Sequence, residues 1–220
     1  MPIFLILFLM FCAWFFYERK KADRKTEQRT KAFWEKESEA NMTLRKDTSD
    51  VPYLKVRFDE LPFDPETGSE SMRQVQDDLL ALRGHSIADL SGMTNTELKL
   101  RYGTPNFNML SEADENYNTL VTGLTRWGEL LMNSGRHDDA ITVLKAAISY
   151  GQRAGTVYQM LAEIYVSRGD SESSKALIAD AENIKSLTKE ATLATLRDAL
   201  ARSYSLSAPS FANDAEDETV

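Results

Sequence analysis

Two stretches of the chain that lie 34 residues apart follow one plan, although they share few identical residues. The first is LLMNSGRHDDAITVLKAAI, residues 130–148, and the second is IYVSRGDSESSKALIADAE, residues 164–182. Each reads as the apolar end of a helix, a glycine, a polar turn, and a second helix with small residues at fixed places. Spacing that persists while the letters change indicates a repeated structural unit.

Taken as units 121–154 and 155–188, the two stretches match at six positions. The matched pairs are Gly128 with Ala162, Leu131 with Tyr165, Gly135 with Gly169, Ala140 with Ser174, Leu144 with Ile178, and Ala147 with Ala181. Small residues recur where helix backbones must approach closely, and larger apolar residues recur where a helix pair fills its core. The matched glycines fall where a helix would end in a left-handed conformation. Asp138, and Asp170 or Ser171, can cap the helices that follow.

In these features the sequence resembles the tetratricopeptide-repeat family. The period, the small eighth, twentieth and twenty-seventh residues and the glycine at the fifteenth all agree, over about 68 residues. The chain departs from the family at the twenty-fourth position, where Leu144 and Ile178 are not aromatic, and it lacks the closing proline. The resemblance implies an all-α fold of stacked antiparallel helix hairpins. The alternative is an α-helical bundle in which the match is a coincidence.

The resemblance also implies a function, because proteins of this family bind peptides or partner proteins along a concave face. That face is formed by the first helix of each repeat. On this chain it maps to Thr122, Thr125, Glu129, Met132, Asn133, Thr156, Gln159, Glu163 and Ser167. The face is neutral to acidic, so we expect a basic or mixed polar and apolar segment, with Glu129 and Glu163 as acceptors. The alternative is that these are merely solvated surface residues.

The N-terminal residues 2–17 carry no charged side chain. As a helix they would be about 24 Å long, somewhat short of a hydrocarbon core of about 30 Å. A signal peptide needs a basic region before the apolar run and a cleavage site after it, and this sequence has neither. We therefore expect a transmembrane anchor over residues 1–17. Basic residues follow the run at once, which predicts a single-pass membrane protein with its N-terminus outside and the bulk of the chain in the cytoplasm. A lipoprotein signal at Cys12 and a buried core helix are the alternatives.

The remaining chain divides by composition. We expect a basic polar stalk over 18–48, an extended linker over 49–69, a helical domain over 70–206 with a capping helix at 189–204, and a disordered acidic tail over 207–220. Residues 18–48 hold 10 basic and 7 acidic side chains, whereas residues 49–220 hold 16 and 27. An acidic domain repels nucleic acid. Within the linker, YLKVRF (53–58) alternates like a strand, and we expect an extended segment against helices, a lone edge, or a plain linker.

Catalysis and cofactor binding have little support in the sequence. His85 and His137 are the only histidines and Cys12 the only cysteine, and none has a second ligand at metal-binding spacing. No glycine-rich phosphate loop is present. We therefore expect no enzyme, no cofactor and no small-molecule substrate, but a membrane-anchored scaffold that binds a protein partner. The alternative is a regulatory or assembly subunit of a membrane protein complex that acts partly through its transmembrane helix.

Overall fold

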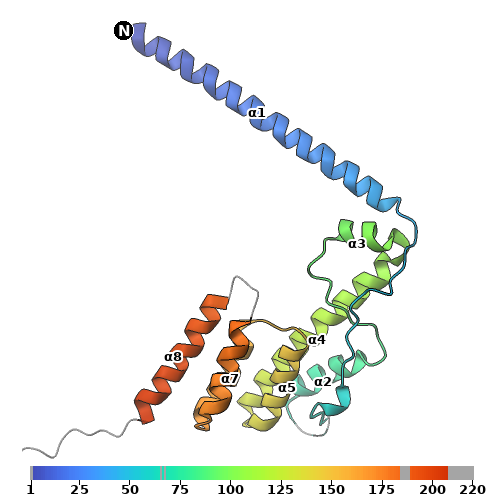
Figure 1. The fold of residues 1–220 in the computed structure, drawn as a ribbon, viewed down its shortest axis with the longest axis vertical. Coiled ribbons are helices and arrows are strands. Elements are labelled where there is room, and N and C mark those ends of the chain that lie inside the picture. The colour runs from blue at the N-terminus through green and yellow to red at the C-terminus, as the bar shows by residue number, and fades with distance from the viewer. Residues whose placement is uncertain (1, 65, 67, 184–188, 208–220) are drawn as a thin grey trace, which may run out of the picture. The chain divides into compact units, whose positions relative to one another are not determined.

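The computed structural model describes residues 2–64, 66, 68–183 and 189–207, and it is all-helical over these residues, as predicted (Figure 1). The α-helices are α1 (Pro2–Asn41), α2 (Glu70–Ala81), α3 (Asn95–Tyr102), α4 (Phe107–Asn133), α5 (His137–Ser149), α6 (Gly155–Ser167), α7 (Ser171–Glu182) and α8 (Lys189–Ser207). Two short 3-10 helices accompany them, η1 (Phe58–Glu60) and η2 (Thr104–Asn106). The only β-type pairing among the described residues is a single bridge between Tyr53 and Ala88.

The chain forms two compact units, and each is described by itself. Unit 1 comprises Met1–Tyr53 and Ala88–Asp114, and unit 2 comprises Leu54–Ile87 and Glu115–Val220. The predicted tail falls largely on residues 208–220, and the second predicted repeat ends on residues 184–188. Both of these stretches lie outside the described residues.

Helix α1 continues without interruption from the apolar run into the basic stretch. Among the described residues, no helix is long and apolar enough to cross a membrane. The predicted single-pass localisation, with a transmembrane anchor at 1–17, is therefore wrong. The physical reason lies in the length of the apolar run, because Glu18 and Arg19 follow it directly and about 24 Å of helix precedes them.

Unit 1 holds the C-terminal end of α1 against α3. Ala40 is fully buried there, and its carbonyl oxygen accepts a hydrogen bond of 2.7 Å from the Thr104 hydroxyl. The Lys99 ammonium lies 2.9 Å from the Glu37 carboxylate in a half-buried ion pair. Helix α3 begins with a capping box of Thr94 and Glu97, as the spacing of these two residues in the sequence predicts. Gly103 ends it at a φ of +88°, a conformation that favours glycine.

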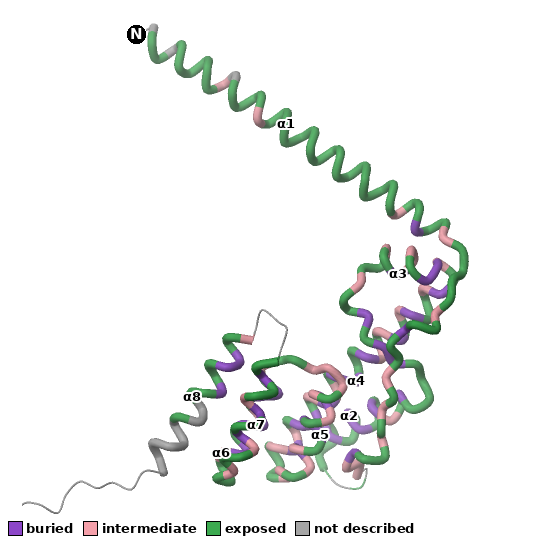
Figure 2. The backbone as a smooth tube through the Cα atoms, in the orientation of Figure 1, coloured by how far each residue is buried: buried purple, intermediate pink, exposed green. Residues whose placement is uncertain are grey.

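The helices of unit 2 pack around one hydrophobic core. Helices α5, α6, α7 and α8 lie side by side, each in contact with the next, and α6 also contacts α8 (Figures 1 and 2). Helix α2 packs on α4, because the space beside Gly123 is filled by the Leu79 side chain. The Trp127 side chain is fully buried and stacks on Phe63, with ring centroids 4.7 Å apart. The core therefore runs from the segment before α2 to α8.

The helix ends of unit 2 repeat at the predicted interval. Helices α4 and α6 end at Asn133 and Ser167, and α5 and α7 begin at His137 and Ser171, each pair 34 residues apart. Gly135 and Gly169 follow the first helices at φ values of +76° and +67°, so both adopt the expected left-handed conformation. Helix α8 begins at Lys189, which again lies 34 residues after Gly155.

Three details of the predicted caps are settled by the structure. Asp170 caps α7, and its carboxylate accepts a 3.0 Å hydrogen bond from the Ser173 amide, as predicted. The prediction for Asp138 is wrong, because Arg136 occupies the N-cap of α5 without a side-chain bond. The capping-box spacing of Ser111 and Asp114 also predicts a helix start at Ser111. This prediction is wrong, because η2 leads directly into α4 at Phe107 and Ser111 lies inside the helix.

Candidate functional site

The nine residues of the predicted partner-binding face lie on two helices of unit 2. Thr122, Thr125, Glu129, Met132 and Asn133 lie on the C-terminal half of α4, and Thr156, Gln159, Glu163 and Ser167 lie on α6. Seven of the nine are exposed, while Thr125 and Met132 are half-buried. We call these nine residues the α4/α6 face.

The outward direction of this face follows from the residues that point inward. In α4, Leu124, Trp127 and Leu131 recur every three or four positions and are fully buried. Glu129 comes two residues after Trp127, which turns it about 200° around the helix and away from the core. In α6, Leu161 and Tyr165 are buried in the same way. Glu163 lies two residues from each of them, which turns it about 200° around the helix, and it is exposed.

Hydrogen bonds within the chain occupy part of the face. The Thr125 hydroxyl donates to the Val121 carbonyl oxygen at 2.7 Å and accepts from the Gln152 amide at 3.2 Å. The Ser167 hydroxyl donates to the Ile164 carbonyl oxygen at 2.8 Å. Thr125 therefore serves mainly to hold the turn before α6 against α4.

The carboxylates of unit 2 differ in whether a cation neutralises them. Asp138 pairs with Arg168 at 2.6 Å, Asp139 with Arg136 at 2.7 Å, and Glu182 with Arg197 at 3.5 Å. The hydrogen bond from Arg168 lowers the pKa of Asp138 below its usual value.

Glu129 and Glu163 form no ion pair with any residue that the structure describes. Glu163 accepts only an amide hydrogen bond of 3.0 Å from Gln159. The two glutamates therefore leave negative charge available on the α4/α6 face. By contrast, the three carboxylates on α5 and α7 named above are neutralised by arginines of the chain. The nearest cation along the chain is Arg126, one helical turn before Glu129, and it forms no ion pair with Glu129 in the described part of the chain.

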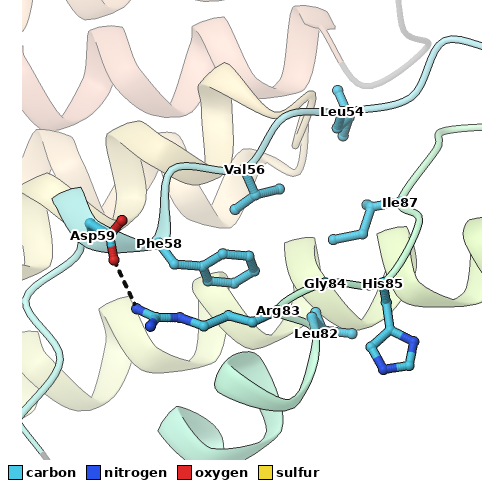
Figure 3. Close-up of a pocket in the computed structure, with 9 residues that line it drawn as sticks. All are labelled: Leu54, Val56, Phe58, Asp59, Leu82, Arg83, Gly84, His85 and Ile87. Atoms are coloured by element: carbon cyan, nitrogen blue, oxygen red, sulfur yellow. Dashed lines mark hydrogen bonds and ion pairs between the residues drawn. The ribbon is translucent and has the colours of Figure 1, made fainter.

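A first pocket of about 250 Å³ lies between residues 54–59 and the turn that follows α2 (Figure 3). The alternating residues Leu54, Val56 and Phe58 line one wall. The Arg83 guanidinium lies 5.7 Å from the centre of the Phe58 ring and 3.2 Å from the Asp59 carboxylate. Arg83 and Asp59 thus neutralise each other. The pocket is therefore small, and this ion pair offers a ligand no uncompensated charge.

The segment before α2 packs against the helices, as one of the open alternatives predicted. The Leu54 amide donates to the Ile87 carbonyl oxygen at 2.8 Å. The Gln76 side chain is 1% exposed and pairs twice with the Asp64 backbone, accepting from its amide at 2.6 Å and donating to its carbonyl oxygen at 3.2 Å. The role of residues 54–64 is therefore to cover the core beside α2.

A second pocket of about 380 Å³ lies between the start of α2 and the end of α4. It is lined by Gly68, Ser69, Met72, Leu130, Asn133, Ser134 and Arg136. Asn133 also belongs to the α4/α6 face, so the pocket borders that face. Sequence reasoning missed this pocket, because no local pattern pairs the start of α2 with a helix end some sixty residues later.

Metal-ligand chemistry has no counterpart in the described part of the chain, where no three His, Cys, Asp or Glu side chains gather around one point. His137 opens α5, and its Nδ1 atom is buried without a hydrogen-bond partner among those residues. His85 is exposed at the rim of the first pocket. Comparison with known proteins places the chain in no group, since no family model, no curated protein and no solved structure matches it.

Proposed function

We propose that this protein is a helical-repeat scaffold of the tetratricopeptide type, which binds a protein or peptide partner on the α4/α6 face. The observation that carries the proposal is the pair Glu129 and Glu163. These residues stand at the same position of two helices that end 34 residues apart, and neither is neutralised by a cation of the described chain.

The repeat arrangement is supported by the burial of small residues at equivalent places. A side-chain carbon added to Gly128 would lie 2.4 Å from Leu144, so α4 and α5 approach closely at this glycine. Ala162, the matching residue of α6, is 2% exposed. In this proposal α4–α5 and α6–α7 are two hairpins of one kind, and α8 is the capping helix that covers the second hairpin.

The partner follows from the chemistry of the face. Two unneutralised carboxylates favour basic side chains, and the surrounding hydroxyl and amide groups can bond to a peptide backbone. The half-buried Met132 offers apolar contact. We therefore propose a basic or mixed polar and apolar segment as the partner, with no nucleic acid, no cofactor and no catalytic turnover.

A second candidate function is an assembly subunit that associates with other proteins through α1. The favouring observation is the apolar surface of α1, where large side chains from Ile3 to Tyr17 are at least half exposed. The two functions separate by deletion. A scaffold that lacks residues 2–17 still binds its partner through the α4/α6 face. An assembly subunit that lacks them no longer binds its partner, because that contact is made by α1.

Site-specific photo-crosslinking tests the leading proposal. The full chain carries a photoreactive amino acid at Gln159 on the face, or at the exposed Lys175 on α7 as a matched control. A partner cross-linked from Gln159 and not from Lys175 is identified, and its binding is then measured with Glu129→Lys/Glu163→Lys. We expect at least a tenfold loss of affinity with this variant. Binding that is unchanged by the double reversal disposes of the proposal.

A further inference from the structure

The second pocket adjoins the α4/α6 face at a defined place. Asn133 belongs to both, and it follows Glu129 by four residues, a distance of about 6 Å along the axis of α4. A segment bound at Glu129 therefore passes within reach of the pocket.

The interior of this pocket is apolar, and its one cation is already neutralised. Met72, only 2% exposed, and the half-buried Leu130 supply the apolar lining. Arg136 donates to Asp139 at 2.7 Å and has the Asp64 carboxylate at 3.9 Å on another side. The pocket therefore offers apolar surface and no free charge, which suits an apolar side chain rather than an ion.

Gly68 shapes the wall of the pocket at the start of α2. Its φ is +111°, and a side-chain carbon at this position would lie 2.7 Å from the Met72 sulfur. Any other residue would be strained and would push Met72 out of its position. The glycine thus keeps the Met72 side chain in the lining.

We propose that this pocket receives one apolar side chain of the partner, next to the basic side chain that Glu129 binds. The inference rests on the proposed function and specifies the partner further. An extended chain advances about 3.3 Å per residue, and alternate side chains point the same way. The step of about 6 Å from Glu129 to Asn133 therefore corresponds to an apolar residue two positions from the basic one.

Peptide selection on the full chain tests this inference. The probe is a library of random nine-residue peptides displayed on phage, selected on three proteins: the wild type, Ser134→Trp and Ser149→Trp. Ser134 lines the pocket, and its hydroxyl donates to the carbonyl oxygen three residues earlier. Ser149 makes the same local bond at the end of α5, away from the pocket, and serves as the matched control.

We expect the wild type and Ser149→Trp to select peptides with a basic residue and an apolar residue two positions apart. Ser134→Trp should keep the basic preference and lose the apolar one. For one selected peptide, Ser134→Trp should raise the dissociation constant at least tenfold in fluorescence anisotropy. Replacing the apolar peptide residue by serine should have the same effect on the wild type and little further effect on the variant. If Ser134→Trp fails to fold, Ser134→Leu narrows the pocket with a smaller side chain.

The outcomes separate this inference from the proposed function. Basic peptides that depend on Glu129 and Glu163, but show no apolar preference, overturn the pocket assignment and leave the α4/α6 face intact. An apolar preference that survives Ser134→Trp also overturns it. A library from which the wild type selects nothing overturns both.

Discussion

The close approach of α4 and α5 at Gly128 makes a quantitative prediction for the variant Gly128→Ala. The added methyl group would lie 2.4 Å and 2.6 Å from two carbons of Leu144, a side chain with no exposed surface. Overpacking a core destabilises a protein by about 1–3 kcal/mol, while alanine inside a helix is favoured over glycine by about 1 kcal/mol. We therefore expect a net loss of about 1 kcal/mol in the free energy of unfolding, from the difference of these two terms.

The same helix supplies the control. At Gly123 an added carbon would lie 2.9 Å from Leu79, a milder overlap than at Gly128. Gly123→Ala should therefore destabilise the protein less than Gly128→Ala does, in urea unfolding followed by circular dichroism. Leu144→Val should relieve the overlap, so it should cost about 1 kcal/mol less in the Gly128→Ala background than in the wild type. A Gly128→Ala protein as stable as Gly123→Ala, with no coupling to Leu144, would refute the reasoning.

Three further predictions concern single contacts. Gln76→Ala removes both bonds to the Asp64 backbone and should lower the free energy of unfolding by about 2–3 kcal/mol; an unchanged urea midpoint would contradict the role of this pair. The pKa of Asp170 lies below its usual 3.8, because Ser173 donates to its carboxylate. The stabilisation by the Asp170 carboxylate is thus complete above pH 3.8 and is lost as the pH falls further. The stability difference between wild type and Asp170→Asn should therefore shrink on acidification. A difference that stays constant would contradict the role of this cap. Glu37→Gln weakens the contact with Lys99 and should speed amide exchange in residues 37–44 while leaving α6 unaffected; equal exchange in the two proteins would show that this ion pair does not hold α1.

The helices of unit 2 were predictable from the sequence because their signals are local. Gly135 and Gly169 mark helix ends through a backbone conformation that few other residues adopt. In unit 1 the signal for α3 is equally local, because Thr94 and Glu97 specify its start through bonds made within four residues. The start of α4 was missed, because the η2 turn that leads into it has no comparably specific signal.

Features that depend on residues far apart in sequence could not be predicted. The pairing of Gln76 with Asp64 and the stacking of Phe63 on Trp127 follow from the packing of unit 2 as a whole. The second pocket depends on the start of α2 meeting the end of α4. The transmembrane prediction failed for a different reason: it weighed the absence of charge in residues 2–17 more heavily than the shortness of the run. The lack of ion-pair partners for Glu129 and Glu163 also required the positions of surrounding cations.

The α4/α6 face depends on the proposed equivalence of the hairpins α4–α5 and α6–α7, and nuclear Overhauser contacts of assigned methyl groups test this equivalence directly. We predict a contact between the Leu144 δ-methyl protons and the Gly128 α-protons. We predict a matching contact, 34 residues on, between the Ile178 δ-methyl and the Ala162 methyl group. A spectrum in which the first contact is present and the second is absent would contradict the account, since α6 and α7 would then not pair as α4 and α5 do.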